Sequence, residues 1–172
     1  MAATFTVEDG TGLADANSYL SIADADQYND DHDADATWDG LADADKQKHL
    51  RLATRYIDAF YGRMWRGGRL EAEQRLDWPR SSAWDDDGFA IDDDAVPSQV
   101  EDATAILAIK SAGGETFLDD ETEGMIVKES DKVGPIASEV EYMGGKDEAK
   151  RFPIVERTLA SVIHSSDQVV RG

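Results

Sequence analysis

The residues with the most potential for chemistry are carboxylates gathered in one loop-like stretch. Residues 76–97 read LDWPRSSAWDDDGFAIDDDAVP and contain two runs of three aspartates. An EF-hand calcium loop takes oxygen ligands from positions 1, 3, 5 and 12 and has glycine at position 6. In that register Asp85 and Asp87 occupy positions 3 and 5 and Asp94 occupies position 12, but Ala83 occupies position 1. These aspartates therefore form an incomplete metal site, where a bound cation would be an accessory to assembly and not a catalytic centre.

Other catalytic patterns are also incomplete. Residues 33–37 read DADAT, which matches the DxDxT motif of haloacid dehalogenase-like phosphatases, but the preceding QYNDDH is not the buried apolar strand that this motif needs. His32, His49 and His164 stand far apart and show no paired metal spacing. Neither a serine nucleophile elbow nor a phosphate-binding glycine loop occurs in the sequence. We therefore expect no catalytic residues, no cofactor and no enzymatic activity.

Charge is distributed unevenly along the chain of 172 residues. The formal net charge is −20, and residues 1–45 contain neither Lys nor Arg. Residues 46–80, the basic segment, hold 9 of the 17 basic residues and only 4 acidic ones, so this segment carries +5 and the rest −25. Such polarity favours head-to-tail contact between copies, which closes rings or grows filaments. The candidate residues for a subunit interface are Arg63, Arg66, Arg69, Trp78 and Arg80.

The basic segment also has a second interpretation. Tyr61 and Trp65 lie among its arginines, and single-strand binders combine aromatic stacking with cationic contacts to phosphate in this way. Alternatively, the aromatic side chains pack in the core while the arginines pair with carboxylates of the same chain or a neighbour. The strongly negative remainder opposes binding to phosphates, and it favours this alternative.

Helical periodicity predicts the elements that must position these residues. The expected helices lie near residues 22–31, 43–63, 97–112 and 153–164, and a hairpin is expected from strands at 125–132 and 136–143. A short strand is expected at 4–8. The fold class is therefore mainly α, a small helical domain of about four helices with a projecting β-hairpin and extended termini. We expect one domain over residues 1–172, with a helical core at about 20–112 and 152–164, a hairpin arm at about 124–143 and a C-terminal tail at 165–172.

Two sets of apolar residues are expected to pack the last helix and residues 76–97 against the rest of the fold. The last helix should use one face for packing, made of Ile154, Leu159, Val162 and Ile163. Residues 76–97, which we call the acidic connection, should be anchored to the rest of the fold by Trp78, Trp84 and Phe89. Its carboxylates would then face solvent, a neighbour or a DNA channel.

Composition excludes several classes of protein. Without cysteine, the chain has neither disulfides nor a thiolate zinc site. No apolar run approaches the length of a membrane span, and the N-terminus lacks the features of a signal peptide. We expect a soluble, unexported protein with no membrane partner. Aspartate outnumbers glutamate by about two to one, a bias common in high salt that fits a halophilic or marine host.

Four stretches of the sequence resemble a known family. They are TVEDGTGLADANSYLSIADADQY, LDWPR, DGFAIDDDAVPSQVEDATAILA and KESDKVGPIASEVEY. Together they resemble phage-encoded proteins labelled "putative DnaT-like single-stranded-DNA-binding protein", and the resemblance covers nearly the whole chain. Members are typically encoded beside capsid genes of tailed viruses, and they are similar in size and helical layout to head-tail adaptor (connector) proteins.

The resemblance implies a structural protein of the virion, assembled in the host cytoplasm. It implies a ring of identical copies, commonly a dodecamer, between the portal and a tail or head-closure protein, with a lumen through which double-stranded DNA passes without specific binding. An acidic lumen would let DNA slide because it offers the phosphates no cationic sites. The alternative function is the labelled one, single-stranded-DNA binding in viral replication.

Overall fold

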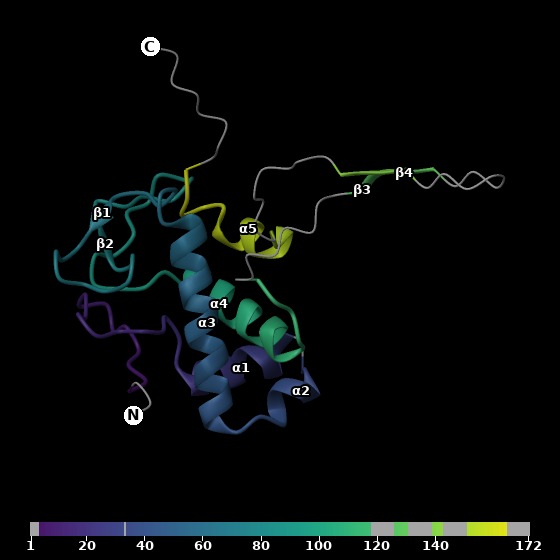
Figure 1. Ribbon diagram of the computed structural model, residues 1–172. Helices are drawn as coiled ribbons and strands as arrows, with labels where there is room; N and C mark the ends of the chain where they lie inside the picture. The colour runs from purple at the N-terminus through teal and green to yellow at the C-terminus, as the bar shows by residue number, and fades with distance from the viewer. Residues whose placement is uncertain (1–3, 33, 118–125, 131–138, 143–150, 165–172) are drawn as a thin grey trace, which may run out of the picture. The chain divides into compact units, whose positions relative to one another are not determined.

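The chain divides into two compact units, which we call the helical unit and the hairpin segment. The helical unit comprises residues 1–115 and 152–172, and the hairpin segment comprises 116–151. The computed structural model (Figure 1) describes residues 4–32, 34–117, 126–130, 139–142 and 151–164, with backbone only for 126–130 and 139–142. These residues form a mainly helical fold with a small antiparallel hairpin, which confirms the predicted fold class.

Helix α3 (Asp43–Tyr61) is the longest element of the helical unit. Leu50, Ala53 and Ile57 recur at spacings of three and four, and all three side chains are fully buried. Acidic residues in its first turn, Asp43 and Asp45, suit the positive end of the helix dipole. The helix was predicted to reach residue 63 but ends at Tyr61, followed by a turn through Gly62.

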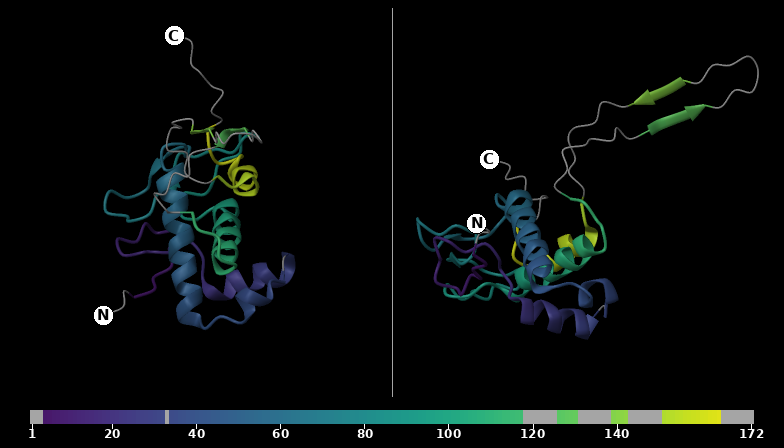
Figure 2. Two further views of the ribbon diagram at one scale, coloured as in Figure 1. Left: turned by 45° about the vertical axis from the view of Figure 1, so that its right-hand side comes forward. Right: turned by 60° about the horizontal axis from the view of Figure 1, so that its bottom comes forward.

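Helix α4 (Ser98–Ala112) is the central helix of the unit. It contacts helices on several sides, which are α1, α2, α3 and α5. Its middle turns, from Ala103 to Ile109, are buried without interruption, which matches a sequence that is apolar all round rather than on one stripe. Figure 2 shows α4 lying beside α3 in both views. Pro97 precedes the helix as its N-cap, and Gly113 ends it by donating its backbone N–H to the carbonyl of Ile109 over 3.0 Å.

Helix α1 (Ile22–His32) begins at a capping pair. The hydroxyl of Ser21 accepts a hydrogen bond from the backbone N–H of Asp24 at 3.1 Å and donates to the Asp24 carboxylate at 2.5 Å. The buried Asn29 then joins α1 to the next element, because its side-chain amide donates to the carboxylate of Asp39 at 2.9 Å.

A short helix that the sequence analysis missed, α2 (Ala36–Asp39), follows α1. Asp35 caps it by accepting the backbone N–H groups of Thr37 and Trp38 at 2.7 and 3.2 Å. Trp38 is fully buried, and its indole N–H donates to Asp26, which also pairs with Lys46. Four residues are too few to show a helical period. Trp38 is the sequence feature that could have indicated a buried segment here.

Helix α5 (Pro153–Leu159) packs against α4 through Val155 and Leu159, which are fully buried. The prediction that Ile154 belongs to the packing face is wrong, because its side chain is 50% exposed. The buried positions start one residue later than expected. Beyond the helix, Ile163 forms a bridge with Trp65, and the backbone N–H of His164 donates to the carbonyl of Met64 at 2.7 Å.

The N-terminal stretch is folded around a carboxylate instead of forming the strand expected at residues 4–8. Val7 makes only an isolated parallel bridge with Ser18. The buried Glu8 accepts three backbone N–H groups, those of Gly10, Gly12 and Leu13. Gly10 has φ +93°, and a Cβ atom there would lie 1.9 Å from the carbonyl oxygen of Asp94. Only glycine therefore allows this turn to pack against the end of the acidic connection.

Two small antiparallel pairs complete the described elements. In the helical unit, β1 (Gly68–Arg69) pairs with β2 (Arg80–Ser81). In the hairpin segment, β3 (Ile126–Ser130) pairs with β4 (Glu139–Tyr142), which confirms the predicted hairpin with shorter strands. The turn expected between these strands and the C-terminal tail at 165–172 lie outside the described residues. No helix of the described part is long and apolar enough to cross a membrane.

Candidate interaction surfaces

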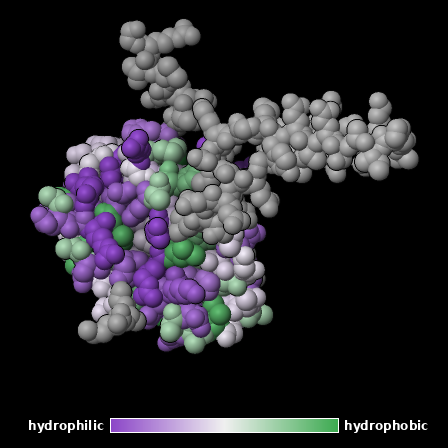
Figure 3. All heavy atoms as spheres, in the orientation of Figure 1, coloured by the Kyte–Doolittle hydropathy of each residue, from purple (hydrophilic) through white to green (hydrophobic). Residues whose placement is uncertain are grey.

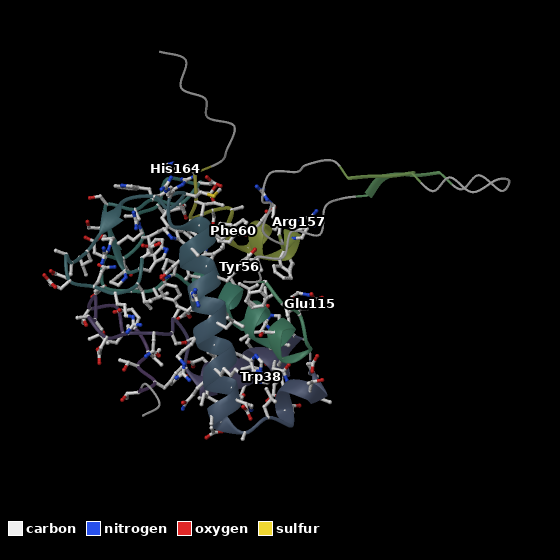
Figure 4. The ribbon with its side chains drawn as sticks, viewed as in Figure 1. Trp38, Tyr56, Phe60, Glu115, Arg157 and His164 are labelled. Atoms are coloured by element: carbon white, nitrogen blue, oxygen red, sulfur yellow. The ribbon has the colours of Figure 1, made fainter. Side chains whose placement is uncertain are left out.

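The aromatic side chains of the basic segment belong to the core of the helical unit. Tyr61, Trp65 and Trp78 are 2%, 3% and 0% exposed. The rings of Tyr61 and Trp65 lie 6.1 Å apart, and those of Trp65 and Trp78 meet edge to face at 5.8 Å. Figure 4 shows Tyr56 and Phe60, which belong to the same group, on the part of α3 nearest α5. The core interpretation of these aromatics is therefore correct, and their faces are not open to nucleic-acid bases.

A buried polar cluster, which the sequence analysis missed, holds the Trp78–Pro79 connection against α3. The hydroxyl of Tyr19 donates to the carboxylate of Asp58 and accepts the backbone N–H groups of Asp77 and Trp78 at 3.0 and 3.2 Å. The peptide bond between Trp78 and Pro79 is cis. Burial raises the pKa of Asp58 to about 7, although its hydrogen bond with Tyr19 acts in the opposite direction.

The groups of this cluster bind one another through hydrogen bonds. The Tyr19 side chain is 1% exposed, and its hydroxyl is fully engaged with Asp58 and the backbone. Burial also raises the pKa of Asp77, which faces the same region from the loop side. A carboxyl group with a pKa near 7 is suited to proton transfer, but here it stabilises the junction between α3 and the connection.

Arg80, one of the predicted interface residues, serves the same junction. Its guanidinium donates three hydrogen bonds to backbone carbonyls: to Arg66 at 2.7 Å, to Gly67 at 2.8 Å and to Asp77 at 3.1 Å. The residue is only 8% exposed. A planar guanidinium can satisfy three carbonyls at once, so the arginine of the Trp-Pro-Arg motif has a clear structural role.

Arg66 joins three parts of the helical unit. It donates to the carbonyl of Ile163 at 3.1 Å and to that of Trp84 at 3.2 Å, and it forms an ion pair with Asp86. The other predicted interface residues differ in their surroundings. Trp78 is buried, Arg69 is exposed and donates to the carbonyl of Gln74, and Arg63 is exposed. A role for these residues between subunits stays a prediction.

The acidic connection presents two large aromatic side chains to solvent. Trp84 is 53% exposed and Phe89 is 70% exposed, so the prediction that they anchor the loop is wrong, whereas that for Trp78 is correct. Among the described residues, no other element buries these two rings. We call residues 84–94 the aromatic loop; it is a small hairpin-like turn in which Trp84 bridges Ala90.

The aspartates of the aromatic loop stabilise the turn itself. The Asp85 carboxylate accepts the backbone N–H groups of Asp87 and Phe89 at 3.0 and 2.8 Å. Within the described residues, no group of three or more His, Asp or Glu side chains is placed to hold a metal ion. The structure thus does not bring Asp85, Asp87 and Asp94 together as a ligand set.

The exposed cations of α3 form a second surface. Lys48 and Arg55 lie two helical turns apart, and Arg63 follows just after the helix ends. All three are exposed, and none of them pairs with a carboxylate among the described residues. We call these three residues the basic stripe. Figure 3 shows that the face of the helical unit turned toward the viewer in Figure 1 is largely hydrophilic.

The three histidines are not grouped. His32 stacks on Tyr28 within α1, with ring centroids 4.2 Å apart, and His164 is exposed. The Nδ1 atom of His49 lies 2.9 Å from the hydroxyl of Ser111, which links α3 to α4. Partial burial lowers the pKa of His49.

Comparisons with known proteins add one finding. The family model described as "Putative DnaT-like ssDNA binding protein" matches residues 3–172. No curated protein and no solved structure matches the chain.

Proposed function

The chain belongs to the family described as "Putative DnaT-like ssDNA binding protein", and from this premise we propose that it acts by protein–protein contact as a head-tail adaptor of a tailed virus. In this role copies of the chain form a ring between the portal and a tail or head-closure component. The protein is then a structural part of the virion and not an enzyme.

The observation that supports this proposal most strongly is the separation of aromatic and cationic groups. A single-strand binder presents aromatic faces beside cations, so that bases stack while phosphates are neutralised. Here Tyr61 and Trp65, the aromatics nearest the cations in sequence, are buried. The exposed Trp84 and Phe89 instead lie among aspartates, which repel phosphates and suit a cationic protein surface.

The charge of the chain is consistent with this function. A net charge of −20 opposes adhesion to DNA, so double-stranded DNA can pass through a ring of such chains without specific binding. The ring copies, the portal and the tail or head-closure protein are the proposed partners, and a dodecamer is the proposed form of the ring.

Single-stranded-DNA binding is the second candidate, and the family description favours it directly. The basic stripe supplies unpaired cations that can contact phosphates. Binding of this kind would be electrostatic, without stacking, and it would weaken steeply as salt is added.

Three measurements separate these functions. We expect native mass spectrometry of the protein, alone and with its portal, to show a discrete ring, and purified virus particles to contain the chain. We expect no electrophoretic shift of single-stranded oligonucleotides, even at low salt. A clear shift at low salt that weakens as salt is added, together with absence of the chain from particles, would contradict the adaptor proposal and establish the second candidate.

A further inference from the structure

We propose that the aromatic loop of one copy docks on the basic stripe of α3 in a second copy. The inference rests on the proposed function in one respect, since it requires that copies of the chain associate. It goes further by assigning the two complementary surfaces and the residues that carry them.

The aromatic loop has the properties of a protein-docking element. In the described residues the large hydrophobic side chains that remain exposed are Trp84, Phe89 and Ile154, and two of these three lie in this loop. Exposed tryptophan and phenylalanine are enriched at the centres of protein interfaces, where their burial supplies much of the binding energy.

The loop is also organised before any partner arrives. The backbone N–H of Asp85 donates to the carbonyl of Phe89, and that of Ile91 donates to the carbonyl of Ala83, both at 2.9 Å. The Arg66 guanidinium holds the carbonyl of Trp84 from the other side. Because these bonds fix the turn, little conformational entropy remains to be lost when the two aromatic side chains bind.

Charge complementarity identifies the occupant. Six aspartates, at positions 85–87 and 92–94, surround the two aromatics, and one of them, Asp86, is paired with a cation. The partner must therefore be cationic. The basic stripe offers Lys48, Arg55 and Arg63, which lack carboxylate partners in their own described surroundings. Between these cations α3 exposes Ala59 and leaves Leu52 half-buried, so the stripe has apolar surface for the aromatic rings.

The pairing is heterologous, because the loop and the stripe are different surfaces of the same chain. Each copy offers one of each, so contact between two copies leaves a free loop at one end and a free stripe at the other. Repetition of the same contact closes a ring when the rotation permits it. Binding of single-stranded DNA to the stripe is the competing possibility, but no exposed aromatic side chain of α3 accompanies these cations.

Cysteine cross-linking tests the contact without disturbing it, because the chain has no cysteine of its own. Ala59→Cys places a small thiol in the stripe, and Ala90→Cys places one beside Phe89, so that the proposed cationic and aromatic contact residues are kept. We expect the double variant, treated with a short bifunctional thiol reagent, to give a ladder of dimers, trimers and larger products. A mixture of the two single variants should give cross-linked dimers and no larger products of this contact. The matched control is the double variant Ala59→Cys/Thr37→Cys. Thr37 is exposed on α2, outside the two proposed surfaces.

Substitutions then assign the contact to its residues. Arg55→Glu with Arg63→Glu, and separately Phe89→Ala, should each reduce cross-linking of the Ala59→Cys/Ala90→Cys variant by roughly tenfold or more. Circular dichroism and thermal unfolding should show that these surface variants fold like the parent.

Three outcomes would overturn the inference. If the double variant cross-links no better than the control while the unmodified protein still forms discrete rings, copies associate through other surfaces and the adaptor proposal stands. If the unmodified protein forms no oligomer, alone or with the portal, the proposed function fails together with the docking contact. If Arg55→Glu with Arg63→Glu abolishes binding to single-stranded oligonucleotides and leaves cross-linking unchanged, the stripe serves nucleic acid.

Discussion

Trp78 and Trp84 are six residues apart in one connection, yet the first is fully buried and the second is 53% exposed. Both are close to aspartate in the sequence. Around Trp78, distant parts of the chain converge: Trp65 contributes its ring, and Tyr19 contributes a hydroxyl to the backbone. Around Trp84 the contacts come mostly from the loop itself and from Arg66.

This difference in contacts shows what decides whether a polar and aromatic segment is buried in the fold or stays on its surface. The junction around Trp78 is stabilised by groups from α3, from the N-terminal stretch and from the connection itself, so the Tyr19 hydroxyl, the Asp58 carboxylate and the Arg80 guanidinium exchange water for protein partners. The aromatic loop satisfies its own backbone and leaves its apolar side chains uncovered. The junction therefore contributes to stability, and the loop remains available for binding.

The largest expected effect compares the two tryptophans directly. Trp78→Ala removes a fully buried ring and should lower the free energy of unfolding by about 4 kcal/mol. Trp84→Ala should lower it by less than about 1 kcal/mol, because the ring is already half in water. Urea unfolding followed by far-ultraviolet circular dichroism measures both changes. Equal losses for the two variants would show that the loop belongs to the core, and Trp78→Phe, which keeps an aromatic ring, should lose less than Trp78→Ala.

The next effect concerns the pH dependence of stability. Burial raises the pKa of Asp58 from 3.8 to about 7, so the folded protein holds the proton of Asp58 more tightly than the unfolded chain. This stabilisation is fully present below the unfolded value of 3.8 and is lost as pH rises through about 7. It amounts to on the order of 4 kcal/mol.

Asp58→Asn isolates this contribution, because its side-chain carbonyl can still accept the Tyr19 hydroxyl without ionising. The variant should therefore gain stability relative to the parent as pH rises from about 4 to about 7. Urea unfolding across that range measures the difference between the two proteins. A difference that stays constant with pH would show that Asp58 ionises normally. Asp93→Asn, at an exposed position of the aromatic loop, serves as the control for removal of one carboxylate.

The smallest of the three effects compares two arginines. Arg80→Lys keeps the charge but cannot reach three carbonyls in one plane, and it should lower the free energy of unfolding by about 2 kcal/mol. Arg63→Lys changes an exposed side chain without a partner and should have an effect close to zero. Chemical denaturation of both variants at one pH is sufficient. Equal effects would mean that the carbonyl contacts of Arg80 add nothing beyond its charge.

The helices and the hairpin could be predicted because their signals are local. The period of α3, the continuous apolar run of α4 and the turn signals of the hairpin all lie within short windows. Helix α2 is too short to show a period, and the burial of Trp38 depends on Asp26 and on neighbouring helices. The position of Ile154 was misjudged for a similar reason, because a helix of seven residues leaves the phase of its buried face poorly defined.

The candidate sites were less accessible to sequence reasoning because they depend on contacts between distant residues. Tyr19 and Asp58 are 39 positions apart, and nothing near either residue indicates that they meet. Whether Trp84 and Phe89 are buried depends on whether another element covers them. The sequence of the loop alone carries no information about such an element. The motif Trp78-Pro79-Arg80 belongs to the stretches that carry the family resemblance, but its structural role depends on the three carbonyls that Arg80 reaches.

The place of the hairpin segment in the chain has a consequence for variation among related proteins. Residues 116–151 leave the helical unit after α4 and return before α5, and these two helices pack on each other. After α5, the backbone N–H of His164 donates to the carbonyl of Met64, so the chain contacts the helical unit there as well. The segment is thus an insertion held at both ends, and the entropic cost of closing such an insertion grows only slowly with its length. The helical unit can keep its architecture while this module lengthens, shortens or changes sequence to match a different neighbour.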